Sequence, residues 1–436
     1  MSDITRIPPE LLSMPNEILT EICTHAYDDV DTESRGKEWL RAVRLTCKQL
    51  NVPATVEFGK RFLVSVPVMV SRFSLGTLLD ICRHPLIGPQ VDEVSLYGKR
   101  YCATSIPLLD EWLGDHIDKR NLRDFRETKC RWDSALEFLD EELEIEQYQG
   151  AFKHLVNALQ TLQSYGKLVT LAVTTDESVK PIGHLQVTEL FSQGTFSNAI
   201  DHDCIRSSSR LLLVAAARSN SHVGRIRITA DENTDHEERH SRTSDSVVEE
   251  SVAKLQSRVK VVHIDLHREK VTVDLRDVVS IVLERMESLV ELHIRTADDA
   301  DLTYRDRIMP DFNRMLRSIA SRCLRIIKLE DTICSQKAIL FLLKRNRETL
   351  RELNLSDVLL QGSWEEVMMW VRDHCSLTFL SASRLVELDE NFDDTEEEYW
   401  VDEDGFGERD ETGDLSSLNS FLVQKRREQD KSDEED

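Results

Sequence analysis

The stretch that comes nearest to a known catalytic pattern runs from His236 to His240 and has the form H-E-x-x-H. In zinc hydrolases with this pattern, two histidines one helical turn apart bind the metal and the glutamate acts as a general base. Such a site also needs an apolar helix face behind the imidazoles and a further ligand. The flanking residues here are acids, asparagine, serine, threonine and arginine, so they form no apolar face. We therefore predict that the match is accidental and that the chain has no metal site.

Other groups that could do chemistry are equally isolated along the chain. Asp201, His202, Asp203 and Cys204 are adjacent on one backbone, where neighbouring side chains point in different directions, so we predict a polar turn. The sequence contains neither a phosphate loop ending in Gly-Lys-Ser/Thr nor a recognisable nucleophile elbow. We therefore expect no catalytic residue, no cofactor and no enzymatic activity of the chain itself.

Composition narrows the class of protein further. The nine cysteines are scattered singly without a C-x-x-C pair, which argues against a disulfide framework or a zinc ribbon and favours a reducing compartment. The first residues lack a signal-peptide pattern, and the apolar run 211–217 is too short to span a bilayer. With a net charge of -25, nucleic acid is a disfavoured partner. We expect a cytoplasmic and/or nuclear protein that does not bind membranes.

The elements that must position any functional residue begin with three short helices near the N-terminus. Pro15 and Glu17 suit a helix start, because proline lacks the donor that a first turn leaves unused and an acid complements the helix dipole. Thr46 with Gln49 fits a capping box that opens the third helix, and Pro53 should kink or end it. The apolar residues with helical spacing are Ile18, Leu19, Ile22 and Ala26 in the first helix and Leu40, Val43 and Cys47 in the second.

This stretch, Leu11 to Leu50, resembles an F-box, the motif by which substrate receptors of SCF ubiquitin ligases bind the Skp adaptor. The usual opening Leu-Pro-x-Glu-Ile-Leu appears as MPNEIL from Met14, and the closing run of leucines and arginines appears as LRAVRLTCK. Met14 replaces a leucine, Leu50 stands where an aromatic residue is common, and AYDDVDTESRGKE lengthens the loop between the first two helices. The resemblance implies that the Skp adaptor is bound by Met14, Pro15, Ile18, Leu19, Ile22, Leu40, Val43, Leu45, Cys47 and Leu50.

A second pattern, apolar-x-x-apolar-x-apolar, recurs late in the chain. It starts at Val259, Leu289, Leu324 and Leu350, and more weakly at Leu377, with helical segments between. Earlier members are predicted at Leu168 and Val223. The pattern resembles an irregular leucine-rich repeat array, in which each strand and helix covers its apolar face only by stacking on the next copy. The asparagine that usually follows such strands is missing, so the turns must differ.

The predicted fold class is therefore α/β: an F-box, then an irregular leucine-rich-repeat-like solenoid, then a disordered acidic tail. We assign 1–58 to the F-box and 59–386 to the repeat region, with a helical excursion at 97–167 and a mobile polar loop at 230–250. The tail, 387–436, holds 21 acids against five bases. The alternative is an ordinary α/β domain whose buried strands happen to start with leucine.

On a repeat array the residues between the inward-facing ones project from the open face of the sheet. Strand stacking should align Lys260 with Arg325 and Arg351, and His263 with His293 and Lys328. Bases outnumber acids among these residues, which indicates either a solvated face with incidental lysines or a dedicated patch. An acidic or phosphorylated protein segment would suit such a patch. The predicted substrate-binding residues are Lys260, His263, His293, Arg295, Arg325, Lys328, Arg351 and Asn354.

The resemblance as a whole implies a substrate-recognition adaptor of an SCF-type ubiquitin ligase. The F-box would bind the Skp adaptor, the repeat region would bind an unidentified protein substrate, and the cullin-RING partner would supply the chemistry. A different reading is a non-catalytic repeat scaffold or nuclear regulator that acts through its acidic, aromatic tail while the N-terminal helices merely cap the array.

Overall fold

The computed structural model describes residues 14–28, 33–98, 100–101, 137, 150–176, 178–185, 200–201, 204–230, 246–266, 273–296 and 305–388. The chain is α/β, and nine described strands form one parallel sheet in the order β1-β2-β4-β6-β7-β8-β9-β10-β11. These strands are β1 (Ser65–Val68), β2 (Glu93–Tyr97), β4 (Val169–Thr174), β6 (Val223–Ala230), β7 (Val261–Leu266), β8 (Glu291–Arg295), β9 (Ile326–Ser335), β10 (Glu352–Gln361) and β11 (Phe379–Leu388). Two short strands, β3 (Arg100–Tyr101) and β5 (Ile200–Asp201), pair antiparallel.

The described residues divide into two compact units, and the division falls within β4. The first unit draws on Met1–Ala172, Val179–Cys204 and Arg218–His222. The second draws on Val173–Ser178, Ile205–Ala217 and the chain from Val223 onward. The H-E-x-x-H stretch, most of the expected polar loop and helical excursion, and the tail after Leu388 lie outside the described residues.

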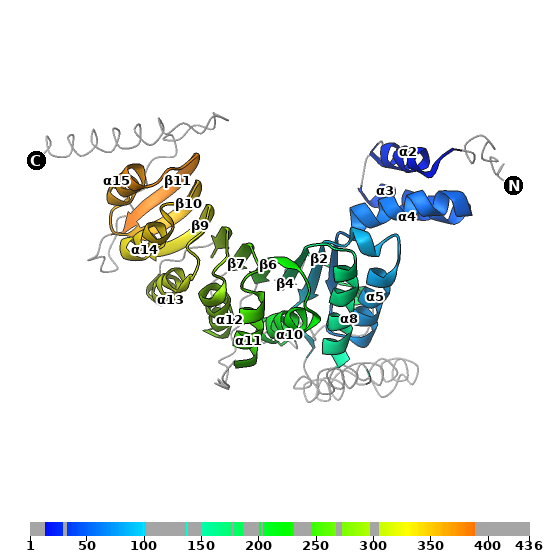
Figure 1. Ribbon diagram of the computed structural model, residues 1–436, viewed down its shortest axis with the longest axis horizontal. Coiled ribbons are helices and arrows are strands. Elements are labelled where there is room, and N and C mark those ends of the chain that lie inside the picture. The colour runs from blue at the N-terminus through cyan, green and yellow to red at the C-terminus, as the bar shows by residue number, and fades with distance from the viewer. Residues whose placement is uncertain are drawn as a thin grey trace, which may run out of the picture. The chain divides into compact units, whose positions relative to one another are not determined.

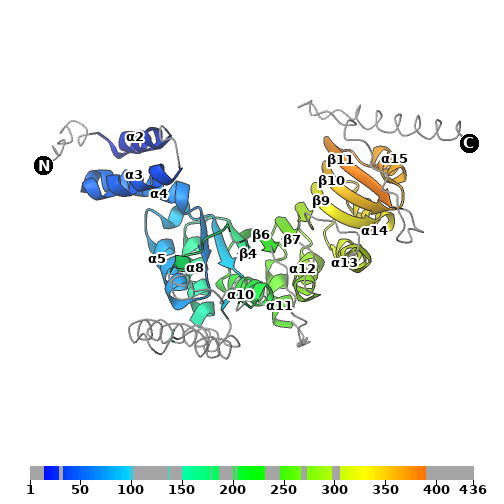
Figure 2. The same cartoon turned by 180° about the vertical axis from the view of Figure 1, so that it is seen from behind.

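Three helices open the first unit, as the sequence predicts: α2 (Asn16–Asp28), α3 (Glu33–Thr46) and α4 (Lys48–Phe62) (Figure 2). Helix α2 begins directly after Pro15, whose carbonyl accepts the Leu19 amide at 3.1 Å. The three helices contact one another and enclose a small shared core. Its buried members are Cys23, Leu40, Ala54 and Phe58, and Trp39, Val43, Phe62 and Leu63 pack against them.

The start and length of α4 differ from the sequence-based expectation. Its N-cap is Cys47, whose Sγ accepts the Leu50 amide at 3.5 Å, while Thr46 is the last residue of α3. The predicted capping box is therefore wrong. Pro53 does not end the helix, which continues to Phe62. Continuation buries Ala54 and Phe58 in the three-helix core, and this burial offsets the hydrogen bond that proline cannot donate.

The insert between the first two helices is mostly helical rather than a loop. Helix α2 extends to Asp28 and α3 begins at Glu33, so only residues 29–32 separate them. The lengthened loop that we expected between the first two helices is therefore shorter than its sequence suggests.

After α4, the first unit continues with β1, a helix and β2. Helix α5 (Arg72–Arg83) begins at the N-cap Ser71, whose side chain accepts the Ser74 amide, and the short 3-10 helix η1 (Gly88–Gln90) precedes β2. Helix α8 (Gly150–Ser164), the described part of the expected excursion, contacts α5. Buried leucines on the two helices are Leu75, Leu78, Leu155, Leu159 and Leu162.

In the second unit helices and strands alternate, and Figures 1 and 2 show the helices along one face of the sheet. The helices are α10 (Cys204–Ser219), α11 (Ser246–Leu255), α12 (Val273–Arg285), α13 (Arg305–Ser318), α14 (Gln336–Asn346) and α15 (Trp364–His374). The strands β4 and β6 to β11 coincide with the predicted repeats, so the predicted strand and helix order is confirmed here.

The register of the parallel strands explains why the repeated apolar positions form a core. Ile327 pairs with Leu292 on one side and Leu353 on the other, so each apolar residue lies beside its counterpart in the next repeat. The first, fourth and sixth positions of four repeats are at most 1% exposed. They are Val259, Val262, Ile264, Leu289, Leu292, Ile294, Leu324, Ile327, Leu329, Leu350, Leu353 and Leu355. In β11, the last strand in the order, Leu380 and Ala382 stay partly exposed.

The last three strands share a kink that the sequence does not reveal. Asp331, Asp357 and Arg384 have left-handed backbone, with φ of 49°, 56° and 48°. The three residues occupy the same register position, because pairing passes from Ser356 directly to Val358 on both sides of β10. The extra residue resets the alternation of faces. Leu355 and Val358 are therefore both buried although an ordinary strand would place them on opposite faces.

Asn346 ties the end of α14 to the strand before it. Its side chain is buried, its Oδ1 accepts the Leu324 amide at 3.1 Å, and its Nδ2 donates to the Leu342 carbonyl at 3.0 Å. Asn346 thus provides an acceptor for the backbone amide of Leu324, just before β9 begins.

We expect Asn346→Ala to lower the free energy of unfolding by about 1 to 3 kcal/mol, because it leaves the buried Leu324 amide without a hydrogen-bond acceptor. Asn157→Ala, at an exposed position of α8, serves as the matched control and should stay within about 0.5 kcal/mol of wild type. Urea unfolding followed by circular dichroism measures both. Equal effects would show that the Asn346 side chain does not hold the turn.

Candidate functional site

One candidate surface is an apolar stripe along α2. Ile18 and Ile22 lie four residues apart on one side of α2, and their exposed fractions are 43% and 37%. Met14, two residues before the helix begins, is 37% exposed. Leu19 and Cys23, on the other side, are almost fully buried in the three-helix core. Helix α2 therefore has two apolar sides, of which the protein itself covers only one.

The other residues predicted to dock a partner divide by exposure. Pro15 and Leu45 are exposed, the latter by 87%, and Val43 and Cys47 are half-buried. Leu19, Leu40 and Leu50 are buried and so contribute to the interior rather than to the exposed surface; their part in adaptor binding stays a prediction. The sequence reasoning overlooked Val52, an exposed apolar residue of α4, although its neighbour Pro53 had drawn attention to that turn.

The second candidate surface is the open face of the sheet in the second unit. Its central row runs Arg227, His263, His293, Lys328 and Asn354 across β6 to β10, as the register shows. The predicted alignment of the two histidines with the lysine is thus confirmed. The imidazoles of His263 and His293 meet edge to face, with 5.2 Å between ring centroids.

Carboxylates on neighbouring strands contact several of these bases. Glu291 Oε1 lies 3.4 Å from His263 Nε2, and Glu330 Oε1 lies 3.3 Å from His293 Nε2. Acids are therefore interspersed among the bases on this face. The acids of the third and seventh repeat positions were readable in the sequence, because these positions also project from the open face, but the interpretation gave weight only to the bases.

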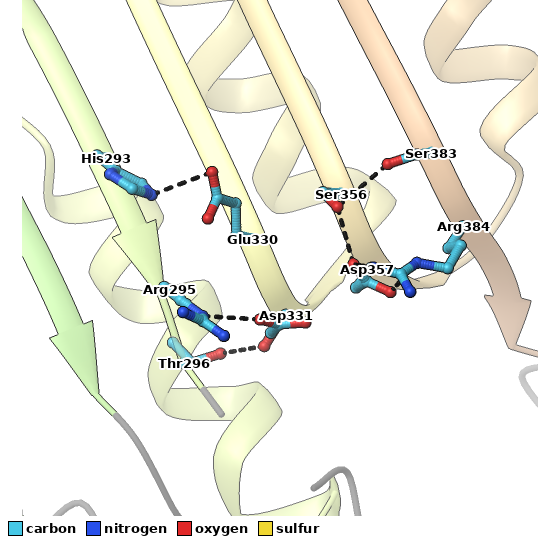
Figure 3. A network of polar contacts seen from close by, with 9 residues as sticks. All are labelled: His293, Arg295, Thr296, Glu330, Asp331, Ser356, Asp357, Ser383 and Arg384. Atoms are coloured by element: carbon cyan, nitrogen blue, oxygen red, sulfur yellow. Dashed lines mark hydrogen bonds and ion pairs between the residues drawn. The ribbon is translucent and has the colours of Figure 1, made fainter. Parts of the chain in front are cut away.

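The kinked strand positions bring two further carboxylates into the same network (Figure 3). Arg295 Nε donates to Asp331 Oδ2 at 2.8 Å, and the Thr296 hydroxyl donates to the Asp331 carbonyl at 2.8 Å. The Arg384 guanidinium pairs with the Asp357 carboxylate through two contacts, Nη2 to Oδ2 and Nε to Oδ1, each 2.6 Å long. These aspartates follow the seventh position directly, and their part in the network depends on the left-handed backbone.

Two serines extend the network toward the last strand. Ser356 Oγ donates to Asp357 Oδ2 at 2.8 Å, and Ser383 Oγ donates to Ser356 Oγ at 3.1 Å (Figure 3). The side chains on this face are mostly half-buried rather than fully exposed. The result is a surface on which acids, bases and hydroxyls of neighbouring strands contact one another.

Within the described residues, no group of three histidine, cysteine, aspartate or glutamate side chains is placed to hold a metal ion. The H-E-x-x-H stretch falls between β6 and α11, outside the described part of the chain. No helix in that described part is both long and apolar enough to cross a bilayer.

The surroundings of His263 change the pKa of its imidazole. The pKa of His263 is lowered from its ordinary value, chiefly because burial disfavours the charged imidazolium. The charges of His293 and Arg225 lower this pKa further, whereas Glu291 opposes the change through its hydrogen bond and its negative charge. Burial thus favours the neutral form of the His263 imidazole.

Comparison with known proteins does not assign the chain to a family. No family model matches the chain, and no curated protein was found to match it.

Substitutions at Asp357 separate the kink from the ion pair. Asp357→Asn and Asp357→Ala both remove the charge that Arg384 contacts, but asparagine tolerates left-handed backbone and alanine does not. We expect the alanine variant to be less stable than the asparagine variant by about 1 kcal/mol in urea unfolding. Equal stabilities would mean that the strand position imposes no backbone preference.

Stability should fall on mild acidification because of His263. Its folded-state pKa lies below the unfolded value, so the unfolded chain takes up the proton first as the pH drops below about 6.5. We expect melting temperature to decrease from pH 7 to pH 5.5, and His263→Asn to reduce this decrease. His222→Asn, at an exposed position, should keep the wild-type dependence. A steeper dependence in His263→Asn would contradict the assignment.

Proposed function

We propose that the chain is a substrate-recognition adaptor of an SCF-type ubiquitin ligase. In this proposal helices α2 to α4 form an F-box that binds the Skp adaptor, and the second unit is an irregular leucine-rich-repeat-like solenoid that binds a protein substrate. The cullin-RING partner supplies the chemistry, so the chain needs no catalytic residue of its own.

The observation that carries the proposal is the exposed stripe of Ile18 and Ile22 on α2, a helix whose other side is core, together with the exposed Met14 just before its first residue. Fully burying an aliphatic side chain contributes about 1.5 to 3 kcal/mol, so two or three such residues can anchor a partner. Interface energy also concentrates in a few central residues. The stripe lies within the stretch that resembles the Leu-Pro-x-Glu-Ile-Leu opening of an F-box. In F-box proteins this motif binds the Skp adaptor.

The substrate side of the proposal rests on the open face of the sheet. Stacked repeats present one continuous surface to an extended partner. Here that surface carries ordered donors and acceptors such as Ser356, Asp357 and Lys328, with acids and bases in turn. A protein segment with both charges suits such a face better than a uniformly charged polymer.

We expect Pro15→Ala combined with Ile18→Ala to weaken binding of a purified Skp adaptor at least tenfold, which requires only about 1.4 kcal/mol. The matched control is Val247→Ala combined with Phe341→Ala, two similarly exposed apolar residues on α11 and α14. This control should bind as wild type does. Calorimetric titration measures the affinities, and circular dichroism verifies that each variant is folded.

Two results would overturn the proposal. Wild-type protein that shows no binding to the adaptor removes its basis. A control variant that loses as much affinity as the double variant on α2 would show that the stripe is not the docking surface.

A further inference from the structure

A row of cations lies at the rim of the open face, where β7, β9 and β10 begin. Lys260, Arg325 and Arg351 each occupy the second position of a strand motif, directly before the first residue of β7, β9 or β10, and are joined through the backbone. The Val290 amide donates to the Lys260 carbonyl at 2.7 Å, the Arg325 amide to the Val290 carbonyl at 2.7 Å, and the Arg351 amide to the Arg325 carbonyl at 2.9 Å. We call Lys260, Arg325 and Arg351 the cationic row.

The cationic row is not neutralised within the described part of the chain. Lys260 Nζ reaches only the carbonyls of Ser257 and Ser288, at 3.4 and 3.5 Å. Arg351 Nη1 donates to the carbonyl of Leu350 at 2.8 Å. No described carboxylate lies within ion-pair distance of the three side chains, whereas Arg295 and Arg384 on the same face each hold an aspartate.

The charge that complements this row is carried by the chain itself. Residues 389–414 follow β11 directly and contain 14 acidic residues against a single arginine, a net charge of -13. In the middle of β9 and β10, Asp331 and Asp357 already pair with Arg295 and Arg384. The cationic row lies instead directly before the first residues of its strands. We propose that the acidic segment 389–414 docks on the cationic row.

The segment is long enough for this contact. Strand β11 has ten residues and spans about 33 Å, which is the distance the chain must retrace to reach the row. Twenty-six extended residues reach up to about 85 Å. Tethering on such a length gives an effective concentration in about the millimolar range, so individually weak ion pairs suffice for docking.

The contact has a regulatory consequence. Arginine forks bind carboxylates and phosphates in the same bidentate manner, so an external acidic or phosphorylated ligand and the segment 389–414 compete for the cationic row. The open face is then fully available only when the segment is displaced. This inference does not depend on the adaptor function, because both partners in the contact belong to this chain.

The test compares how fast a glutamate-specific protease cleaves the tail of the full-length chain. We remove the row with Lys260→Gln, Arg325→Gln and Arg351→Gln together, which adds no new cleavage site. The matched control is Arg314→Gln, Arg317→Gln and Lys337→Gln, three exposed cations on α13 and α14 with the same change of charge. Intact mass spectrometry follows loss of the tail, and circular dichroism verifies folding.

At 50 mM salt we expect the tail of the row variant to be cleaved about fivefold faster than that of wild type, with the control variant unchanged. At 0.5 M salt wild type should approach the row variant, because screening weakens exposed ion pairs. Rates are normalised to a synthetic peptide of residues 389–436 under each condition. Equal cleavage of wild type and row variant at low salt overturns the proposal. Protection that increases with protein concentration also overturns it, since the tail would then bind a second copy.

Discussion

The parallel register of β6 to β11 is the constraint on which the second unit depends. Each strand and its helix expose an apolar side that only the next repeat can cover, so the core exists only when neighbouring strands align fourth position with fourth and sixth with sixth. The same alignment sets the open face. Because side chains alternate along a strand, stacking the buried residues also stacks His263, His293 and Lys328 in a row.

The kinks at Asp331, Asp357 and Arg384 are a second consequence of stacking. A left-handed residue in one strand would break pairing with a regular neighbour, but three kinks in the same register leave the ladder intact on both sides. The carboxylates of Asp331 and Asp357 then join the polar network. The polar network is therefore as much a product of backbone geometry as of charge.

Periodicity in the sequence was sufficient to predict strand and helix order, the buried positions of each repeat and the row of histidines, because all follow from local spacing. It was insufficient for the kinks, since aspartate at 331 and 357 looks like any surface acid until the register is known. It also did not separate Leu19, Leu40 and Leu50, which are buried, from the exposed apolar residues. Spacing identifies an apolar residue without saying whether the core or a partner covers it. The F-box and leucine-rich-repeat interpretations stay predictions.

Hydrogen exchange along the second unit tests the dependence on register most directly. If each strand is held by its neighbours, the amides of β8, β9 and β10 should exchange slowest and with similar protection, and β11, whose core-side residues stay partly exposed, should exchange faster. Mass spectrometry of peptides from the labelled full-length chain provides the measurement. Protection in β11 equal to or above that in β9 would contradict the claim that stacking of successive repeats holds the sheet together.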